Sequence, residues 1–394
     1  MAKVTLTPDS GFARELMDAG GDSLKKCYQC ATCAVACPMA PDNSPYPRKE
    51  MVWASWGQKD KLMGDPDIWL CHNCGNCAEL CPRGAKPADV MSAARNVVYK
   101  NLVGPAKVGE WMSSPKGLPM LFLIPAVLWL VVWAIMANCF AGGEWFPRVD
   151  GRIVFGSIFY GDYTIDPLFM ITFFGALFLI AKGCVKLWKQ FRQTKGKTLV
   201  LGPTKPWYIH LVQMLWDEVV THKKFDDCQT GPRTGQPENS RKFGHICMII
   251  GFASLAVVTA IVAGGHWIGK VIPFLSIHTP MPLYFPVKLL ANFGAIVLIV
   301  GLVSLTLRRK RQNPKFFSSN YHDWYLLGII WAVALTGLLS QLFRLADAVH
   351  CAFLVYYLHL VFVWMLFAYL PWSKLGHLAY RATALLYVRM YGRG

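Results

Sequence analysis

The chain has 394 residues, of which 54% are apolar and only 16% charged, so its composition excludes an ordinary soluble protein of this length. The formal net charge is +17, but residues 1–116 hold 14 basic and 12 acidic side chains, which nearly cancel. The basic excess therefore belongs to the apolar remainder, where basic loops between membrane spans explain it. No basic, aromatic-interleaved surface occurs outside those loops, so we expect no nucleic-acid partner.

The first hundred residues are polar and rich in cysteine. Residues 10–19 have the pattern of a short amphipathic helix, and helices are also predicted over 50–63 and 89–100. The proline-rich stretch 41–47 predicts a loop, and the glycines and prolines of 104–119 predict a linker. Residues 1–22 lack the apolar core of a signal peptide, so we expect this region to stay in the cytoplasm.

Eight of the 13 cysteines form two identical runs with the spacing Cys-x2-Cys-x2-Cys-x3-Cys-Pro. The first comprises Cys27, Cys30, Cys33 and Cys37, and the second Cys71, Cys74, Cys77 and Cys81. The pattern resembles that of bacterial ferredoxins, in which three thiolates of one run and the fourth of the other hold each [4Fe–4S] cluster. We therefore predict one cluster on Cys27, Cys30, Cys33 and Cys81, and another on Cys71, Cys74, Cys77 and Cys37.

Structural zinc and a disulfide framework are the alternatives for these cysteines. A single CxxC would favour zinc, but two complete four-cysteine runs do not, and the clustering argues for metal in a reducing compartment. A non-redox transporter with a zinc-stabilised head is the corresponding functional alternative. Iron and acid-labile sulfide would exclude it.

Six apolar segments then follow, each near the length of about 20 residues that crosses a bilayer as a helix. They are predicted at 117–140, 167–188, 245–265, 283–307, 324–343 and 351–372. The loops on one side contain 21 Lys and Arg residues and those on the other only four, which places both termini and the head in the cytoplasm. Residues 206–224 have helical spacing without spanning length and predict an interfacial helix on the cytoplasmic side.

Histidines inside or at the ends of these spans are candidate haem ligands, because a haem b in a helix bundle is held by inward-facing histidines. His359 lies within the sixth span, and His377 follows 18 residues later, which on a continuous helix would put both on one face. His245 and His266 begin and end the third span. The pattern suggests an inner pair, His245 with His377, and an outer pair, His266 with His359, although His266 also suits an interfacial loop.

Family resemblance adds to this interpretation. Residues 22–100 resemble the small iron–sulfur subunit of heterodisulfide reductase, and the resemblance includes the paired cysteine runs. Residues 240–394 resemble the cytochrome b subunits of respiratory nitrate reductase and membrane-bound heterodisulfide reductase, on the stretch from Leu358-His359-Leu360 to Gly376-His377. The fusion resembles the C subunit of the quinone-interacting membrane-bound oxidoreductase (Qmo) of sulfate reducers.

The resemblance implies an inner haem on His245 and His377 and an outer haem on His359. The outer haem's other ligand in that family corresponds to Leu255 here, which leaves one or two haems and the role of His266 open. Lys288 matches a lysine of the family's quinol site, although a boundary lysine reaching the interface explains it equally well. No adjacent Cys-Cys pair of the catalytic heterodisulfide reductase type occurs.

The expected protein is all-α. It has a bis-[4Fe–4S] ferredoxin-like head (1–104), a linker (105–119) and a six-helix transmembrane cytochrome b bundle (120–394). We expect a protein of the cytoplasmic membrane that relays electrons from menaquinol to flavin-containing partners, toward adenylylsulfate reductase. Those partners would resemble the A-type flavoprotein of heterodisulfide reductase, as the A and B subunits of Qmo do. The alternative is the membrane arm of a disulfide-reducing complex.

Overall fold

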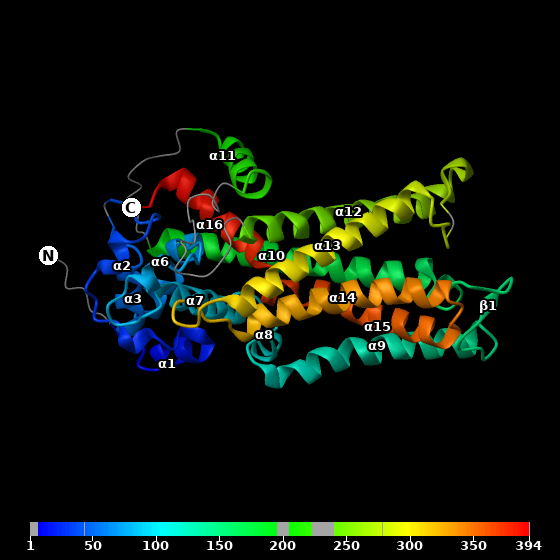
Figure 1. Ribbon diagram of the computed structural model, residues 1–394, viewed down its shortest axis with the longest axis horizontal. Helices are drawn as coiled ribbons and strands as arrows, with labels where there is room; N and C mark the ends of the chain where they lie inside the picture. Colours follow the sequence, from blue (N-terminus) through cyan, green and yellow to red (C-terminus); the bar gives the residue numbers. More distant parts are fainter. Residues whose placement is uncertain (1–6, 43, 195–204, 223–239, 278, 394) are drawn as a thin grey trace.

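The computed structural model describes residues 7–42, 44–194, 205–222, 240–277 and 279–393. Within these residues the chain is helical apart from one two-stranded antiparallel hairpin, β1 (Arg148–Val149) and β2 (Arg152–Ile153). The cysteine-rich head lies at one end, and six long helices run away from it toward the hairpin at the other end (Figure 1). The all-α class with a dicluster head and six long apolar helices is confirmed.

Short helices build the head around one longer helix, α7 (Pro87–Leu102). The others are α1 (Phe12–Leu16), η1 (Met17–Gly21), η2 (Leu24–Lys26), α2 (Thr32–Val35), α3 (Arg48–Ser55), α4 (Lys59–Met63), α5 (Asp67–Leu70) and α6 (Asn76–Glu79). Nearly all of α7 is buried, since η1, α5 and α8 pack around it. The helix predicted over 89–100 is present with shifted ends, whereas the one over 10–19 is divided into α1 and η1 and the one over 50–63 into α3 and α4.

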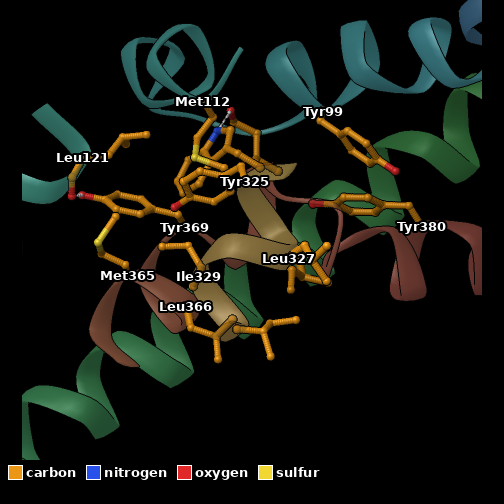
Figure 2. Close-up of a cluster of buried hydrophobic side chains, with 14 of the residues drawn as sticks. Tyr99, Met112, Leu121, Tyr325, Leu327, Ile329, Met365, Leu366, Tyr369 and Tyr380 are labelled. Carbon is orange, nitrogen blue, oxygen red and sulfur yellow. Dashed lines mark hydrogen bonds between the residues drawn. The ribbon is translucent and has the colours of Figure 1, made fainter. Parts of the chain in front are cut away.

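The segment predicted as a linker is helical and packed. It forms α8 (Ala106–Met112) and η3 (Pro115–Gly117), and Met112 is fully buried. Figure 2 shows Met112 in a cluster with Tyr325, Tyr369 and Leu121, and Tyr369 donates a hydrogen bond of 3.0 Å to the carbonyl of Leu121. The head and the long helices therefore share one continuous apolar core instead of being joined by a loop.

Among the described residues, six helices are long and apolar enough to cross a membrane, in agreement with the six predicted spans. They are α9 (Leu118–Cys139), α10 (Asp166–Thr194), α12 (Ser240–Gly269), α13 (Pro286–Arg311), α14 (Tyr321–Leu345) and α15 (Val349–Ala368). Short elements connect or extend them: η4 (Phe155–Ser157), η5 (Gly161–Ile165), η9 (Pro273–Leu275), η10 (Leu370–Trp372), α11 (Trp207–Leu215) and η6 (Trp216–Val220). The described part of the predicted interfacial helix is α11 with η6, which packs on α16 through Met214.

The sixth span ends earlier than expected. A continuous helix through His359 and His377 is wrong, because α15 stops at Ala368 and a separate helix, α16 (His377–Tyr391), begins at His377. Pro371 lies within the break, where its ring cannot continue an α-helix. The two histidines consequently belong to different helices, and α16 lies at the head end of the molecule, near the C-terminus (Figure 1).

The long helices pair unequally. α12 packs mainly on α13, α14 on α15, and α10 on α15 and α16. Glycine allows the closest of these contacts: a Cβ at Gly301 of α13 would lie 3.0 Å from the Cβ of Cys247, and one at Gly251 of α12 would lie 2.8 Å from the Cβ of Leu298. Small residues of this kind let apolar helices approach without a hydrophobic driving force between them.

Candidate iron–sulfur site and its membrane-side contacts

The two cysteine loops adopt the same backbone conformation 44 residues apart. Gln29 and Ala31 have φ of 59° and 70°, and their counterparts Asn73 and Gly75 have φ of 52° and 90°. In each loop the first cysteine's sulfur accepts a backbone hydrogen bond from the residue two positions later, at 3.4 Å. These left-handed residues coil each loop around its own thiols, as a run that wraps one cluster requires.

The thiols lie in two groups, each with members from both cysteine runs. The charged neighbours of Cys33 are Cys27, Cys30 and Cys81, so the first loop is completed by the last cysteine of the second run. Those of Cys77 are Cys71, Cys74 and Cys37, the last from the first run. The same four residues, Cys37, Cys71, Cys74 and Cys77, line one cavity with Tyr46 and Met39.

Each group of thiols suits a cluster better than free cysteines. Burial, together with the neighbouring sulfurs, raises the pKa of Cys33 to about 12 and that of Cys37 to about 11. Four thiols converging in such a place favour their anionic form only when a cation binds them. The donor sets therefore fit two [4Fe–4S] clusters, and the role of each cysteine as a ligand stays a prediction.

The first group, which we call the outer quartet (Cys27, Cys30, Cys33 and Cys81), lies at the surface. Cys30 is exposed, and apolar side chains beside the loops are exposed too, including Val35 at 91% and Tyr28 at 68%. Arg83 lies over the Tyr28 ring at 4.1 Å and donates a hydrogen bond of 2.9 Å to its hydroxyl. A redox partner can reach this quartet directly.

The second group, the inner quartet (Cys37, Cys71, Cys74 and Cys77), faces the membrane-side helices. Phe317, from the loop between α13 and α14, is buried against Gly75, where a Cβ would lie only 2.5 Å from the ring's Cζ. Two bonds fix that loop beside the head: Lys86 Nζ donates to the Pro314 carbonyl at 2.7 Å, and Ser318 Oγ donates to Asp89 Oδ2 at 2.6 Å.

Two arginines of the membrane-side helices bind the backbone around Cys71. Arg381 of α16 is buried and donates through Nη1 to the carbonyls of Trp69 at 2.9 Å and Cys71 at 3.1 Å. Arg241 of α12 donates to the carbonyls of His72 and Asn73. Guanidinium groups suit this task because their donors are fixed in one plane and always charged. Both helices thus contact the backbone of the loop that carries Cys71.

A buried acidic group lies on the other side of the same loop. The carboxylates of Glu50, Asp65 and Asp67 are buried within 4.8 Å of one another, and Lys49 Nζ lies 3.2–3.3 Å from an oxygen of each. Arg393, beyond α16, adds a contact of 2.9 Å from Nε to Asp67. Burial outweighs the attraction of Lys49 and raises the pKa of Glu50 to about 8.

The two candidate inner-haem ligands lie one helical turn from these arginines. His245 follows Arg241 by four residues on α12, and His377 precedes Arg381 by four residues on α16. His377 Nδ1 donates to the carbonyl of Lys374 at 2.6 Å, which leaves Nε2 as the nitrogen with a lone pair. Each of these histidines thus lies one helical turn from an arginine that contacts residues 69–73.

His359 of α15 has a similar tautomer. The hydroxyl of Thr336 on α14 donates to the Ala332 carbonyl at 2.6 Å, so its oxygen accepts from His359 Nδ1 at 3.1 Å. Gly337 leaves room for the imidazole, since a Cβ there would lie 3.0 Å from its Cε1. This tautomer leaves the lone pair on Nε2, which fits the donor chemistry that a haem ligand would need, and the role of His359 as a ligand stays a prediction.

The two remaining candidates lie at the far ends of their helices. Nε2 of His266 contacts Asp162 of η5, and Lys270 Nζ lies 2.6 Å from the other oxygen of that carboxylate. His266 therefore contacts the carboxylate of Asp162, whereas His359 forms a hydrogen bond with the hydroxyl of Thr336. Lys288 is half-buried at the start of α13, with Arg344 as a charged neighbour. The roles of both residues stay predictions.

Sequence reasoning missed the arginines and the acidic group. The available signal was spacing: Arg241 and Arg381 stand four residues from candidate ligands, on the side toward the head in each helix. Nothing in the sequence predicted the burial of Glu50, Asp65 and Asp67, because isolated acids in a polar segment are ordinarily exposed.

Comparison with known proteins divides the chain in the same way. Residues 23–85 match the model of the 4Fe-4S dicluster domain, and residues 117–393 match that of Citrate utilization protein B, CitB. No solved structure matches the chain.

Curated relatives match the head. The C subunit of the H(2):CoB-CoM heterodisulfide,ferredoxin reductase of Methanothermobacter marburgensis is 41% identical over 93 residues, 23% of this chain and 50% of the relative. The iron-sulfur C subunit of the CoB--CoM heterodisulfide reductase of Methanopyrus kandleri is 38% identical over 78 residues, 20% of this chain and 41% of the relative. A protein of Archaeoglobus profundus is 36% identical over 87 residues, which are 22% of this chain and 46% of the relative. Its name describes it as similar to the C subunit of heterodisulfide reductase.

The chain spans about half the length of the curated relatives it matches. The 4Fe–4S dicluster match covers both cysteine loops, while the CitB match covers all six long helices and α16. Since the latter takes in well over half of the chain, this protein belongs to the CitB family and carries a 4Fe–4S dicluster domain at its head.

Proposed function

We propose that this chain is a membrane-anchored electron-transfer subunit that links a membrane quinol to soluble redox partners. When bound, two [4Fe–4S] clusters and haem b would each carry one electron at a time. The chain's own residues hold these groups in sequence: the outer quartet at the surface, the inner quartet beneath it, and His245 and His377 on the membrane side. His359 would hold a second haem farther along the bundle.

The observation that carries this proposal is the double contact at residues 69–73. Arg241 and Arg381 bond the same short loop from two helices, and each stands one turn from a candidate haem ligand. A structural anchor alone would not require a histidine beside each arginine, nor a cysteine at the point of contact. The arrangement supports an electron route between the inner quartet and the membrane helices.

Charge and partners complete the proposal. The excess of Lys and Arg in the loops on one side favours a chain that spans the cytoplasmic membrane with its head in the cytoplasm. The quinone would be menaquinone, with Lys288 at its site. The partners would be flavin-containing proteins that resemble the A-type flavoprotein of heterodisulfide reductase, as in the Qmo complex with adenylylsulfate reductase. The exposed apolar surface around the outer quartet supports a docked partner.

A disulfide-reducing complex is the second candidate. The relatives of the head are named as heterodisulfide reductase subunits, which favours a membrane arm of that kind. The chain itself has no adjacent cysteine pair, so disulfide chemistry would belong to a partner. Co-purification with a protein that carries adjacent cysteines would favour this candidate over the first.

The test is spectroscopy of the purified full chain. We expect about eight iron atoms in clusters, acid-labile sulfide, and b-type optical bands that a menaquinol analogue reduces. His377→Leu and His359→Leu should each lose b-type absorbance, whereas His350→Leu, at an exposed helix start, should not. Wild-type protein without b-type bands would remove the haem from the proposal, and zinc in place of iron would remove the relay.

A further inference from the structure

A cavity of about 500 Å³ lies between the end of α7 and the side of α10, away from both cysteine quartets. Four lysines line it: Lys100 from α7, and Lys182, Lys186 and Lys189 from α10. None of its described lining residues is acidic. The cavity is therefore a concentrated positive site that the electron relay does not use.

The three lysines of α10 form one stripe. Positions 182, 186 and 189 are separated by four and three residues, so they share one face of the helix. Gly183 and Leu187 lie on the neighbouring, buried face, where a Cβ at Gly183 would lie 3.0 Å from the Tyr380 ring. Rotation of α10 is thus fixed by packing, and the lysine stripe stays directed at the cavity.

Among the residues that the structure describes, Lys186 is the one lysine of this group with a hydrogen bond. Lys186 Nζ donates to the carbonyls of Asn101 at 3.1 Å and Leu102 at 3.3 Å, at the C-terminal end of α7. Acids are absent nearby in sequence as well: between Asp166 and Asp217 there are seven basic residues and no Asp or Glu. Cations gathered without acids repel one another, and an anion in the cavity would relieve that repulsion.

Apolar surface continues directly from the cavity along α10. Val185, which lines it, is 55% exposed, and Phe178, one turn before Lys182, is 69% exposed. Lys182 is the first charged residue after the apolar run of this predicted span, so the cavity lies where lipid headgroups would be. An anion with apolar chains matches both surfaces, whereas a soluble anion would match only the lysines.

We propose that this cavity binds the phosphate of an anionic phospholipid. Lys100, Lys182 and Lys189 would face the phosphate, and the acyl chains would lie along Val185 and Phe178. Lys186 binds the carbonyls of Asn101 and Leu102. The next carbonyl along the chain, that of Val103, accepts a hydrogen bond of 3.2 Å from Trp372 Nε1. A bound lipid would thus brace the junction between the head and the long helices. This inference is independent of the electron relay.

The experiment is native mass spectrometry of the detergent-purified full chain titrated with phosphatidylglycerol, with phosphatidylcholine as the uncharged comparison. We expect retention of phosphatidylglycerol and about a fivefold loss of affinity for each lysine removed, hence about 25-fold for the Lys182→Gln/Lys189→Gln double variant. Lys310→Gln, an exposed lysine at the end of α13, is the matched control and should bind normally. The charge-preserving Lys182→Arg/Lys189→Arg variant should retain binding, which separates charge from misfolding.

Three outcomes would overturn the proposal. Equal retention of both lipids would show no selection for negative charge. An equal loss in Lys310→Gln would show general attraction to a basic surface. Full displacement by millimolar inorganic phosphate would identify a soluble anion as the ligand instead of a lipid.

Discussion

The two cysteine loops have the same spacing and the same backbone conformation, yet their surroundings are opposite. The outer quartet is open to solvent, with Cys30 exposed, whereas Phe317, Arg241 and Arg381 enclose the loop of the inner quartet. The difference arises outside the loops, from helices that follow more than 150 residues later in the chain. Ligand spacing thus specifies which metal group binds, and the enclosing helices specify what that group can exchange electrons with.

The largest expected effect separates the two quartets. Cys81→Ala should remove the cluster of the outer quartet and Cys37→Ala that of the inner one, because each completes the other run's loop. Iron should fall from about eight to about four atoms per chain in each variant. Iron and sulfide analysis with electron paramagnetic resonance would measure this. If Cys81→Ala instead removed the cluster on Cys71, Cys74 and Cys77, the exchange of fourth ligands would be wrong.

Removal of the arginine beneath the inner quartet should have the next largest effect. Arg381→Met leaves the buried carbonyls of Trp69 and Cys71 without their donor, which should cost about 2–4 kcal/mol of unfolding free energy. Loss of the positive charge should also lower the inner cluster's reduction potential by tens of millivolts.

A redox titration followed by electron paramagnetic resonance would measure the potential shift. Arg381→Lys, which keeps the charge but not the planar fork, should recover the potential more fully than the stability. Equal shifts of both clusters would contradict a contact specific to the inner quartet.

A glycine and an alanine at equivalent positions offer a matched pair. Gly75→Ala places a Cβ 2.5 Å from the Phe317 ring at φ +90°, and we expect a loss of roughly 1–3 kcal/mol in unfolding free energy. Ala31→Gly, in the exposed loop, should change stability by less than about 1 kcal/mol. Denaturant titration of both variants measures the contrast. Similar losses would show that Phe317 does not distinguish the loops.

The smallest effect concerns pH. The pKa of Glu50 is raised to about 8 by burial, so between its unfolded pKa near 4.5 and pH 8 the folded state binds more protons than the unfolded one. Stability should therefore fall as pH rises through that window.

Glu50→Gln should flatten this dependence and raise stability at pH 8 by roughly 1–2 kcal/mol. Thermal unfolding in detergent from pH 5 to 9 measures it, with Glu15→Gln, a partly exposed ion-pair member, as the control. Parallel pH profiles for wild type and Glu50→Gln would show that Glu50 is ionised throughout.

Much of the architecture follows from local patterns. The cysteine spacing predicted a head with two iron–sulfur clusters, which the match to the 4Fe-4S dicluster domain supports, while the assignment of Cys37 and Cys81 as exchanged ligands stays a prediction. The six apolar runs predicted six long helices, since length and hydrophobicity suffice for that purpose. These features depend on neighbours in sequence.

Features that depend on distant contacts were not predictable. The segment 105–119 looked like a loop because of its glycines and prolines, but the burial of Met112 against the long helices stabilises α8. Periodicity alone suggested one helix through His359 and His377, and the break at Pro371 places them on two. The arginine contacts at residues 69–73 required the three-dimensional path of α12 and α16.

The bond between Arg381 and the Trp69 carbonyl joins residues 312 positions apart. At about 5–20 residues per second, the ribosome needs about 15–60 s to reach Arg381 after it has made the inner cysteine loop. For that interval the nascent head lacks the helix that contacts the backbone at residues 69–71, beside the inner quartet. The order of synthesis therefore leaves a period in which iron and sulfide can enter the inner quartet from the side that the finished protein closes.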